Sequence, residues 1–63
     1  MTIKEFMETY KGFDWKNGTI ILVKGATPII CTGSWTLVLQ KHMNCIVQGW
    51  THNENIMVIT IKK

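Results

Sequence analysis

The first twelve residues constrain the fold most, because they can form only a short helix that must pack against another part of the chain. Thr2 and Glu5 have the spacing of a capping box, in which the two side chains satisfy free N–H groups at the start of a helix. The apolar residues that follow at helical spacing share one face: Ile3, Phe6, Met7 and Tyr10. A helix over Thr2–Gly12 is too short to persist alone in water. We therefore expect the later segments to provide a sheet on which it packs.

The amount of chain limits the protein to one domain. Its 63 residues are 46% hydrophobic and include three Trp, two Phe and one Tyr, which is the composition of a folded domain and not of a disordered tail. A chain this short is close to the lower limit for burying a stable core without disulfides or metal ions. We expect residues 1–63 to form a single small domain.

The charge pattern argues against nucleic acid as the main partner. The net charge is +3, but all seven basic residues are lysines, and lysine lacks the planar fork with which arginine reads guanine and binds phosphates. The lysines are spread along the chain, except for Lys62 and Lys63 at its end, which we expect in solvent. This distribution indicates solubility and protection of sheet edges more than a binding patch.

Cysteine usage and the absence of targeting signals indicate an intracellular protein. Cys31 and Cys45 are too few to define a disulfide framework, so we expect free, buried thiols. No charged segment followed by an apolar run opens the sequence, and no apolar stretch is long enough to span a membrane. The expected location is the cytoplasm, or the host-cell cytoplasm if a phage encodes the chain, with no membrane partner.

Two segments in the first half predict a β-hairpin. The loop Phe13–Gly18 ends in Asn-Gly, which favours positive φ and a sharp reversal. Thr19–Lys24 is rich in β-branched residues and contains no breaker, so it predicts a strand. Gly25–Pro28 is a turn signal, and Ile29–Thr32 can pair back as the second strand.

The segment Ser34–His42 is compatible with two structures. Trp35, Val38 and Leu39 fit one face of a helix, whereas Trp35, Leu37 and Leu39 fit one face of a strand. The serine at its start and the Lys-His pair at its end favour a helix, while its β-branched residues favour a strand. We prefer a short helix or helical turn and keep the strand as the alternative.

The second half predicts another hairpin. Met43–Thr51 alternates as strands do, and Gly49 within it indicates a bulge or a ring packed over bare backbone. The polar residues His52–Asn55 connect it to a last strand, Ile56–Ile61. Both faces of that last strand are apolar except at Thr60, so we expect it to be central in the sheet or covered on both sides.

These elements predict an α+β fold. An N-terminal helix packs across a small antiparallel sheet of about four strands, built from two hairpins joined by a short helical or extended connector. One short helix covers only one face of the sheet. The other face should keep several of these residues in water: Ile20, Leu22, Ile30, Ile46 and Trp50. A small monomer rarely leaves such a patch bare, so we expect a homodimer or docking on a larger partner protein.

No arrangement of residues predicts catalysis, a cofactor or a metal ion. The residues of metal-ligand type are Cys31, His42, Cys45 and His52. Their spacing lacks the close cysteine pairs of zinc sites, and an alternating strand would point His42 and Cys45 to opposite faces, away from nucleophilic pairing. Three of the four carboxylates are accounted for by capping, helix surface and turn, and the glycines are scattered instead of forming a phosphate loop. We therefore expect a protein that is not an enzyme.

The candidate partner-binding residues are aromatic or lie beside an aromatic residue: Trp15, Lys16, Trp35, Trp50 and His52. Trp15 with Lys16, and Trp50 with His52, can form platforms on which a nucleobase stacks. Trp15 and Trp50 can equally be core residues, which a domain of this size needs. Trp35, on the connector, is the anchor that we expect to face a protein partner.

Short segments over most of the chain form a recognisable pattern: the opening Met1–Phe6, the strand start Gly18–Ile20, the pair Ser34-Trp35 and the last strand Ile56–Ile61. This pattern resembles short uncharacterised α+β proteins encoded by phages and mobile elements of Gram-positive bacteria. The resemblance implies a small α+β fold and a host-directed role, for example inhibition of a bacterial defence system such as a CRISPR nuclease, and it defines no functional residue. Many inhibitors of nucleic-acid enzymes are acidic mimics, and this basic chain departs from them.

The sequence as a whole predicts a non-enzymatic protein-interaction module. Its expected partner is a second copy of the chain or a host protein, with no cofactor. The alternative is a small single-stranded nucleic-acid or nucleotide-binding protein that uses Trp and Lys.

Overall fold

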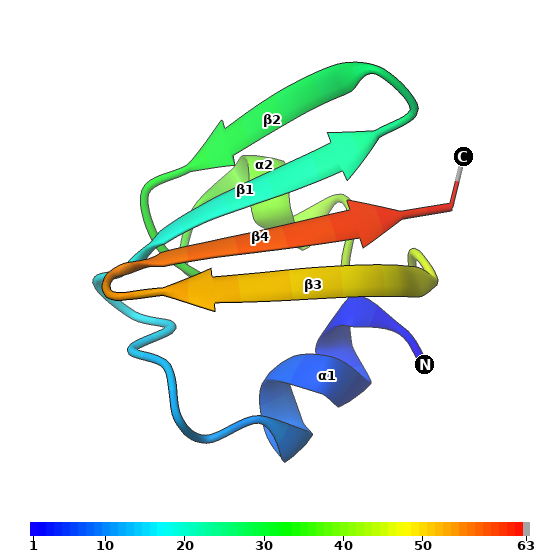
Figure 1. The fold of residues 1–63 in the computed structure, drawn as a ribbon. Helices are drawn as coiled ribbons and strands as arrows, with labels where there is room; N and C mark the ends of the chain where they lie inside the picture. Colours follow the sequence, from blue (N-terminus) through cyan, green and yellow to red (C-terminus); the bar gives the residue numbers. More distant parts are fainter. Residues whose placement is uncertain (63) are drawn as a thin grey trace.

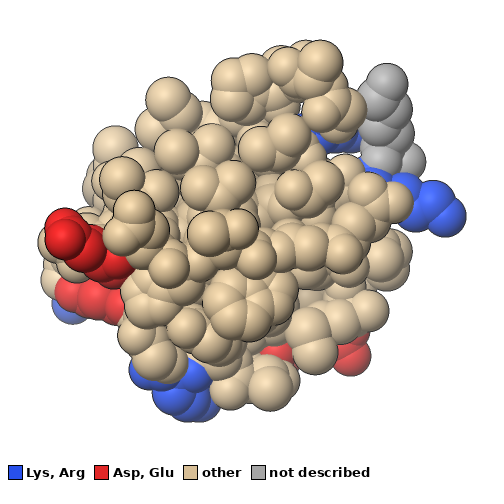
Figure 2. All heavy atoms as spheres, in the orientation of Figure 1, with Lys and Arg blue, Asp and Glu red and all other residues tan. Residues whose placement is uncertain are grey.

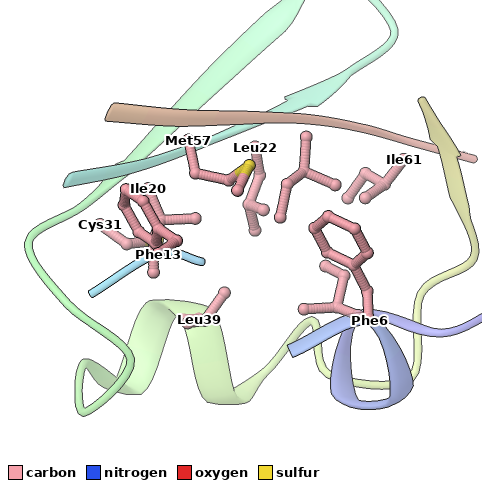
Figure 3. Packing of buried hydrophobic residues seen from close by; sticks show 10 residues of the cluster. Phe6, Phe13, Ile20, Leu22, Cys31, Leu39, Met57 and Ile61 are labelled. Carbon is pink, nitrogen blue, oxygen red and sulfur yellow. The ribbon is translucent and has the colours of Figure 1, made fainter. Parts of the chain in front are cut away.

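Within residues 1–62 four strands form one sheet (Figure 1), and two short helices lie on the same side of it (Figure 3). The computed structural model describes residues 1–62, so the expectation for Lys63 lies outside the described residues. The elements in chain order are α1 (Ile3–Thr9), β1 (Thr19–Lys24), β2 (Thr27–Cys31), α2 (Leu37–Gln40), β3 (Val47–Asn53) and β4 (Ile56–Ile61). The small α+β fold is therefore confirmed, with β1 and β4 at the predicted residues.

The pairing of the strands is mixed, and the prediction of a wholly antiparallel sheet is wrong. The order is β2-β1-β4-β3, with antiparallel pairs at both sides and a parallel pair, β1 with β4, in the centre. Parallel neighbours need a long crossover, and residues 32–46 between the two hairpins provide it on one side of the sheet. The crossover places β4 of the second hairpin beside β1, so that β4 is a central strand of the sheet. A central position suits β4 because both of its faces are apolar.

The start of α1 has the predicted cap. The Thr2 N–H donates to Glu5 Oε1 at 2.8 Å, and the Glu5 N–H donates to Thr2 Oγ1 at 3.2 Å. The backbone hydrogen bond from Thr2 is the main reason why the pKa of the Glu5 carboxyl is lowered. The helix ends earlier than Gly12, because Tyr10 is already extended at φ −89° and ψ 101°.

The expectation that the N-terminal helix packs across the sheet is wrong, because the helix is shorter than the sheet is wide. Seven helical residues extend about 10 Å, whereas four strands at about 4.8 Å spacing make a sheet about 19 Å wide. α1 lies at the β3 margin of the sheet, and it buries only Ile3 and Phe6 (Figure 1). Leu39 of α2 and Phe13 of the loop between α1 and β1 add buried side chains on that side (Figure 3).

The core lies between the sheet and the two helices (Figure 3). Its buried members are Ile3, Phe6, Phe13, Ile20, Leu22, Cys31, Leu39, Met57, Ile59 and Ile61. Alternate residues of β1 and β4 point into it, as period-2 strands require. Two of the residues that we placed among those left in water, Ile20 and Leu22, are therefore buried, whereas Ile30, Ile46 and Trp50 are exposed.

The crossover contains a helix, so the preferred structure for the connector is confirmed. The cap of α2 is Thr36, whose hydroxyl accepts from the Leu39 N–H at 3.4 Å, two residues later than the predicted serine. Leu39 is completely buried and anchors α2 to the core. The preceding turn needs glycine at position 33, where φ is +154° and a Cβ would approach the indole nitrogen of Trp35 to 2.6 Å.

β3 begins later than predicted because residues just before it pair with the N-terminus. The Ile3 N–H donates to the Cys45 carbonyl at 3.0 Å, and the Val47 N–H donates to the Met1 carbonyl at 2.8 Å. The predicted irregularity at Gly49 is confirmed as a register shift between Val47 and Gly49. This shift places Trp50 opposite Ile59, on the core side of the sheet, and the strand then continues to Asn53.

Two leucines test the placement of the core. Leu22→Ala should lower the free energy of unfolding by about 2–5 kcal/mol, because it leaves a cavity under β1. Leu37→Ala is the matched control, since that side chain is 79% exposed, and the loss should stay within about 0.5 kcal/mol. Urea denaturation at low temperature measures both values, and similar losses at the two positions would contradict this core.

Candidate protein-binding surface

The side of the sheet opposite the core carries neither helix, and we call it the open face (Figure 1). It is formed by the strand residues that alternate with the buried ones: Thr19, Ile21, Val23, Pro28, Ile30, Gly49, Thr51, Asn53, Ile56, Val58 and Thr60. Ile30 is 66% exposed and Ile56 is 42% exposed. Large aliphatic side chains on this face therefore meet water in the single chain.

Strand register arranges the open face in rows. In the central row Ile21 is flanked by Ile30 on β2 and by Val58 on β4, and Thr51 on β3 completes the row. The neighbouring row runs from Pro28 through Val23 and Thr60 to Gly49. The aliphatic residues thus gather on β2, β1 and β4, while the part on β3 is small and polar.

The open face has no charged side chain, since none of its residues is Lys, Asp or Glu. Figure 2 shows this side of the molecule, with lysines and carboxylates only around its margin. An uncharged aliphatic surface bordered by polar groups is typical of protein interfaces. Its residues include no cation for binding phosphate and no carboxylate or imidazole for acid–base chemistry.

Three of the predicted site residues, Trp15, Trp50 and His52, lie in one aromatic cluster with residues of α1 and the following loop. The Trp50 ring lies 4.9 Å from Tyr10 and 5.4 Å from Phe6, measured between centroids. Trp15 contacts Phe6 edge-on at 5.7 Å and donates its indole N–H to the Tyr10 carbonyl at 2.8 Å. The half-buried Trp15 therefore joins α1 to the loop, as a core residue would.

His52 belongs to the same cluster, and both of its ring nitrogens are occupied. Nε2 lies 2.9 Å from the Glu54 carbonyl oxygen, which can only accept, so we assign the proton to Nε2. Nδ1 then accepts from the Tyr10 hydroxyl at 2.8 Å. This arrangement fixes the ring on the β3 strand and leaves neither nitrogen open for a ligand.

A groove of about 570 Å³ runs between α1 and the start of β3. Its lining residues are Met1, Phe6, Thr9, Tyr10, Val47, Gln48, Gly49 and Trp50. The lining contains no Lys, Asp or Glu side chain, and the Trp50 side chain is 47% exposed there. The groove can therefore accept an apolar group but offers no lysine for a phosphate.

The other two predicted site residues, Trp35 and Lys16, are not part of the aromatic cluster. Trp35 is 67% exposed in the turn before α2, and with the exposed Leu37 and Val38 it forms a second apolar area, the α2 patch. α2 lies behind the sheet in Figure 1, so this patch and the open face are on opposite sides. Lys16 is exposed in the loop before β1. The aromatic cluster therefore holds three of the five predicted residues.

Sequence reasoning missed the aliphatic centre of the open face at Ile21 and Val23. Both faces of β1 are apolar, and hydrophobicity alone therefore could not decide which face is buried. The residues of β4 divide in the same way, with Ile56 and Val58 on the face opposite Met57.

The described residues contain no group of three or more His, Cys, Asp or Glu side chains close enough to hold a metal ion. Both cysteines are free, as predicted; Cys31 is buried and Cys45 is half-buried. Burial raises the pKa of the Cys31 thiol, against a smaller opposing effect of its hydrogen bond with Thr36. Cys31 is therefore a core thiol with little thiolate character.

Comparisons with known proteins add no family to this description. No protein-family model, no curated protein and no solved structure matches the chain. Among residues 1–62, neither α1 nor α2 has the length or the apolar content needed to cross a membrane.

The two thiols should differ sharply in reactivity. In the folded protein an alkylating reagent should modify Cys45 first, because Cys31 is buried and its raised pKa keeps it protonated. Mass spectrometry after brief native labelling gives the order, and labelling in denaturant provides the control in which both thiols react. Earlier modification of Cys31 would contradict its position in the core.

Proposed function

We propose that this chain is a non-enzymatic protein-interaction module that binds its partner through the open face. The observation that supports the proposal is a sheet face whose centre is aliphatic and whose residues carry no charge. Small proteins seldom leave such a surface in water, because covering it with another apolar surface is favourable. The proposed location is the cytoplasm.

A protein partner explains this surface better than a nucleic acid does. Single-strand binders combine aromatic stacking faces with a positive groove. Here Trp15 is held in the aromatic cluster, and the groove beside Trp50 has no lysine in its lining. The residues of the open face contain no lysine either.

The resemblance to small phage and mobile-element proteins suggests a setting for this function. A host-directed inhibitor, for example of a CRISPR nuclease, acts by occupying a surface of its target. We propose that the open face, rather than mimicry of nucleic-acid charge, serves binding in that setting, because this chain has a net charge of +3.

Site-specific cross-linking tests which surface binds protein. The photo-reactive amino acid benzoylphenylalanine replaces Ile30 on the open face or Leu37 on the α2 patch, both of which are exposed. The full chain is then irradiated in cells that naturally make it. We expect discrete cross-linked protein products from position 30 and few from position 37.

The two positions control for each other, because both probes are large, apolar and exposed. Products from position 37 alone would move the binding surface to the α2 patch. The absence of products from both positions, with the folded protein present, would contradict a protein-interaction module.

A further inference from the structure

We propose that the occupant of the open face is a second copy of this chain, so that two sheets stack face to face. This inference rests on the proposed function, because it names the partner of the same surface. It makes the aliphatic rows of β2, β1 and β4 the centre of a symmetric interface.

The absence of charge on the open face is the reason for proposing a second copy. A partner that places Lys, Arg, Asp or Glu on the open face would lose hydration there without gaining an opposite charge, since the face has none. A second copy presents an equally uncharged surface. The threonines near the β3 side can keep their hydroxyls at the wet rim.

The area of the open face sets the expected strength of the dimer. Strands about 4.8 Å apart and about six residues long, at about 3.3 Å per residue, give a footprint of about 400 Å². Two copies then cover about 800 Å², below the roughly 1,200–2,000 Å² of stable interfaces. The face is therefore large enough for a weak, reversible dimer and too small for an obligate one.

The distribution of residues selects one arrangement of the two copies. A two-fold dimer brings the same surface of each copy together. The aliphatic rows meet each other, and the polar β3 parts also meet, when the two-fold axis runs across the strands, so that β1 of one copy lies over β1 of the other. Sheets stacked in this way lie about 10 Å apart with strands crossing at about 30°. The α2 patch then stays exposed on each outer side.

Sedimentation velocity of the purified full chain tests this dimer. We expect the average mass to rise reversibly towards twice the chain mass as the concentration approaches about 1 mM. High salt should not weaken the dimer, because the open face contributes no ion pair that salt could screen. Ile30→Lys should raise the dissociation constant at least about tenfold, because it puts like charges into the interface.

Leu37→Lys is the matched control, because it places the same charge on an exposed position outside the proposed interface. It should dimerise like the unmodified chain, and circular dichroism should show that both variants are folded. Concentration-dependent NMR shifts of the unmodified chain provide a test without any variant. They should centre on Ile21, Ile30 and Val58 and spare Leu37.

The outcomes separate this inference from the proposed function. A chain that stays monomeric at about 1 mM, or a dimer broken by Leu37→Lys and not by Ile30→Lys, would overturn the second copy. If the same monomer cross-links through position 30 to a different protein, the interaction module remains and only its partner changes. A monomer with no cross-links from position 30 would overturn both.

Discussion

The packing of alternate β1 and β4 side chains against two short helices is the interaction on which the rest of the structure depends. Ile20, Leu22, Met57 and Ile59 are completely buried there, and they belong to the two central strands. A helix of seven residues and one of four supply most of the opposing layer. So little helix can cover only one side of the sheet. The open face is a direct consequence of how the chain is divided between strands and helices.

The local features of the fold could be predicted, because short-range chemistry decides them. Thr2 and Glu5 form the capping box, β1 and β4 have the predicted bounds, and Gly49 marks the bulge. The parallel pairing of β1 with β4 could not be predicted, because it depends on how the crossover 32–46 packs. The same applies to the start of β3, which the distant residues Met1 and Ile3 determine by pairing with Val47 and Cys45.

The candidate site differs from the prediction because exposure and aromatic character are separate properties. Tryptophans are common interface anchors, and this made Trp15, Trp35 and Trp50 the expected binding residues. In the structure Trp15 and Trp50 contact Phe6, so their rings support α1, whereas Trp35 remains exposed in the α2 patch. The uncharged surface is aliphatic instead. This surface is defined by the strand register, which places Ile21 between Ile30 and Val58 and which the sequence does not specify.

The central claim is that one side of the sheet is open in the single chain and is covered by association. The most direct measurement is NMR of the methyl groups with a soluble paramagnetic probe, at low and at high protein concentration. In dilute solution the probe should broaden Ile21, Ile30 and Val58 and spare the buried Ile20 and Ile59, and at high concentration the first group should become protected. Protection of both groups in dilute solution, or broadening of the first group at every concentration, would contradict the account.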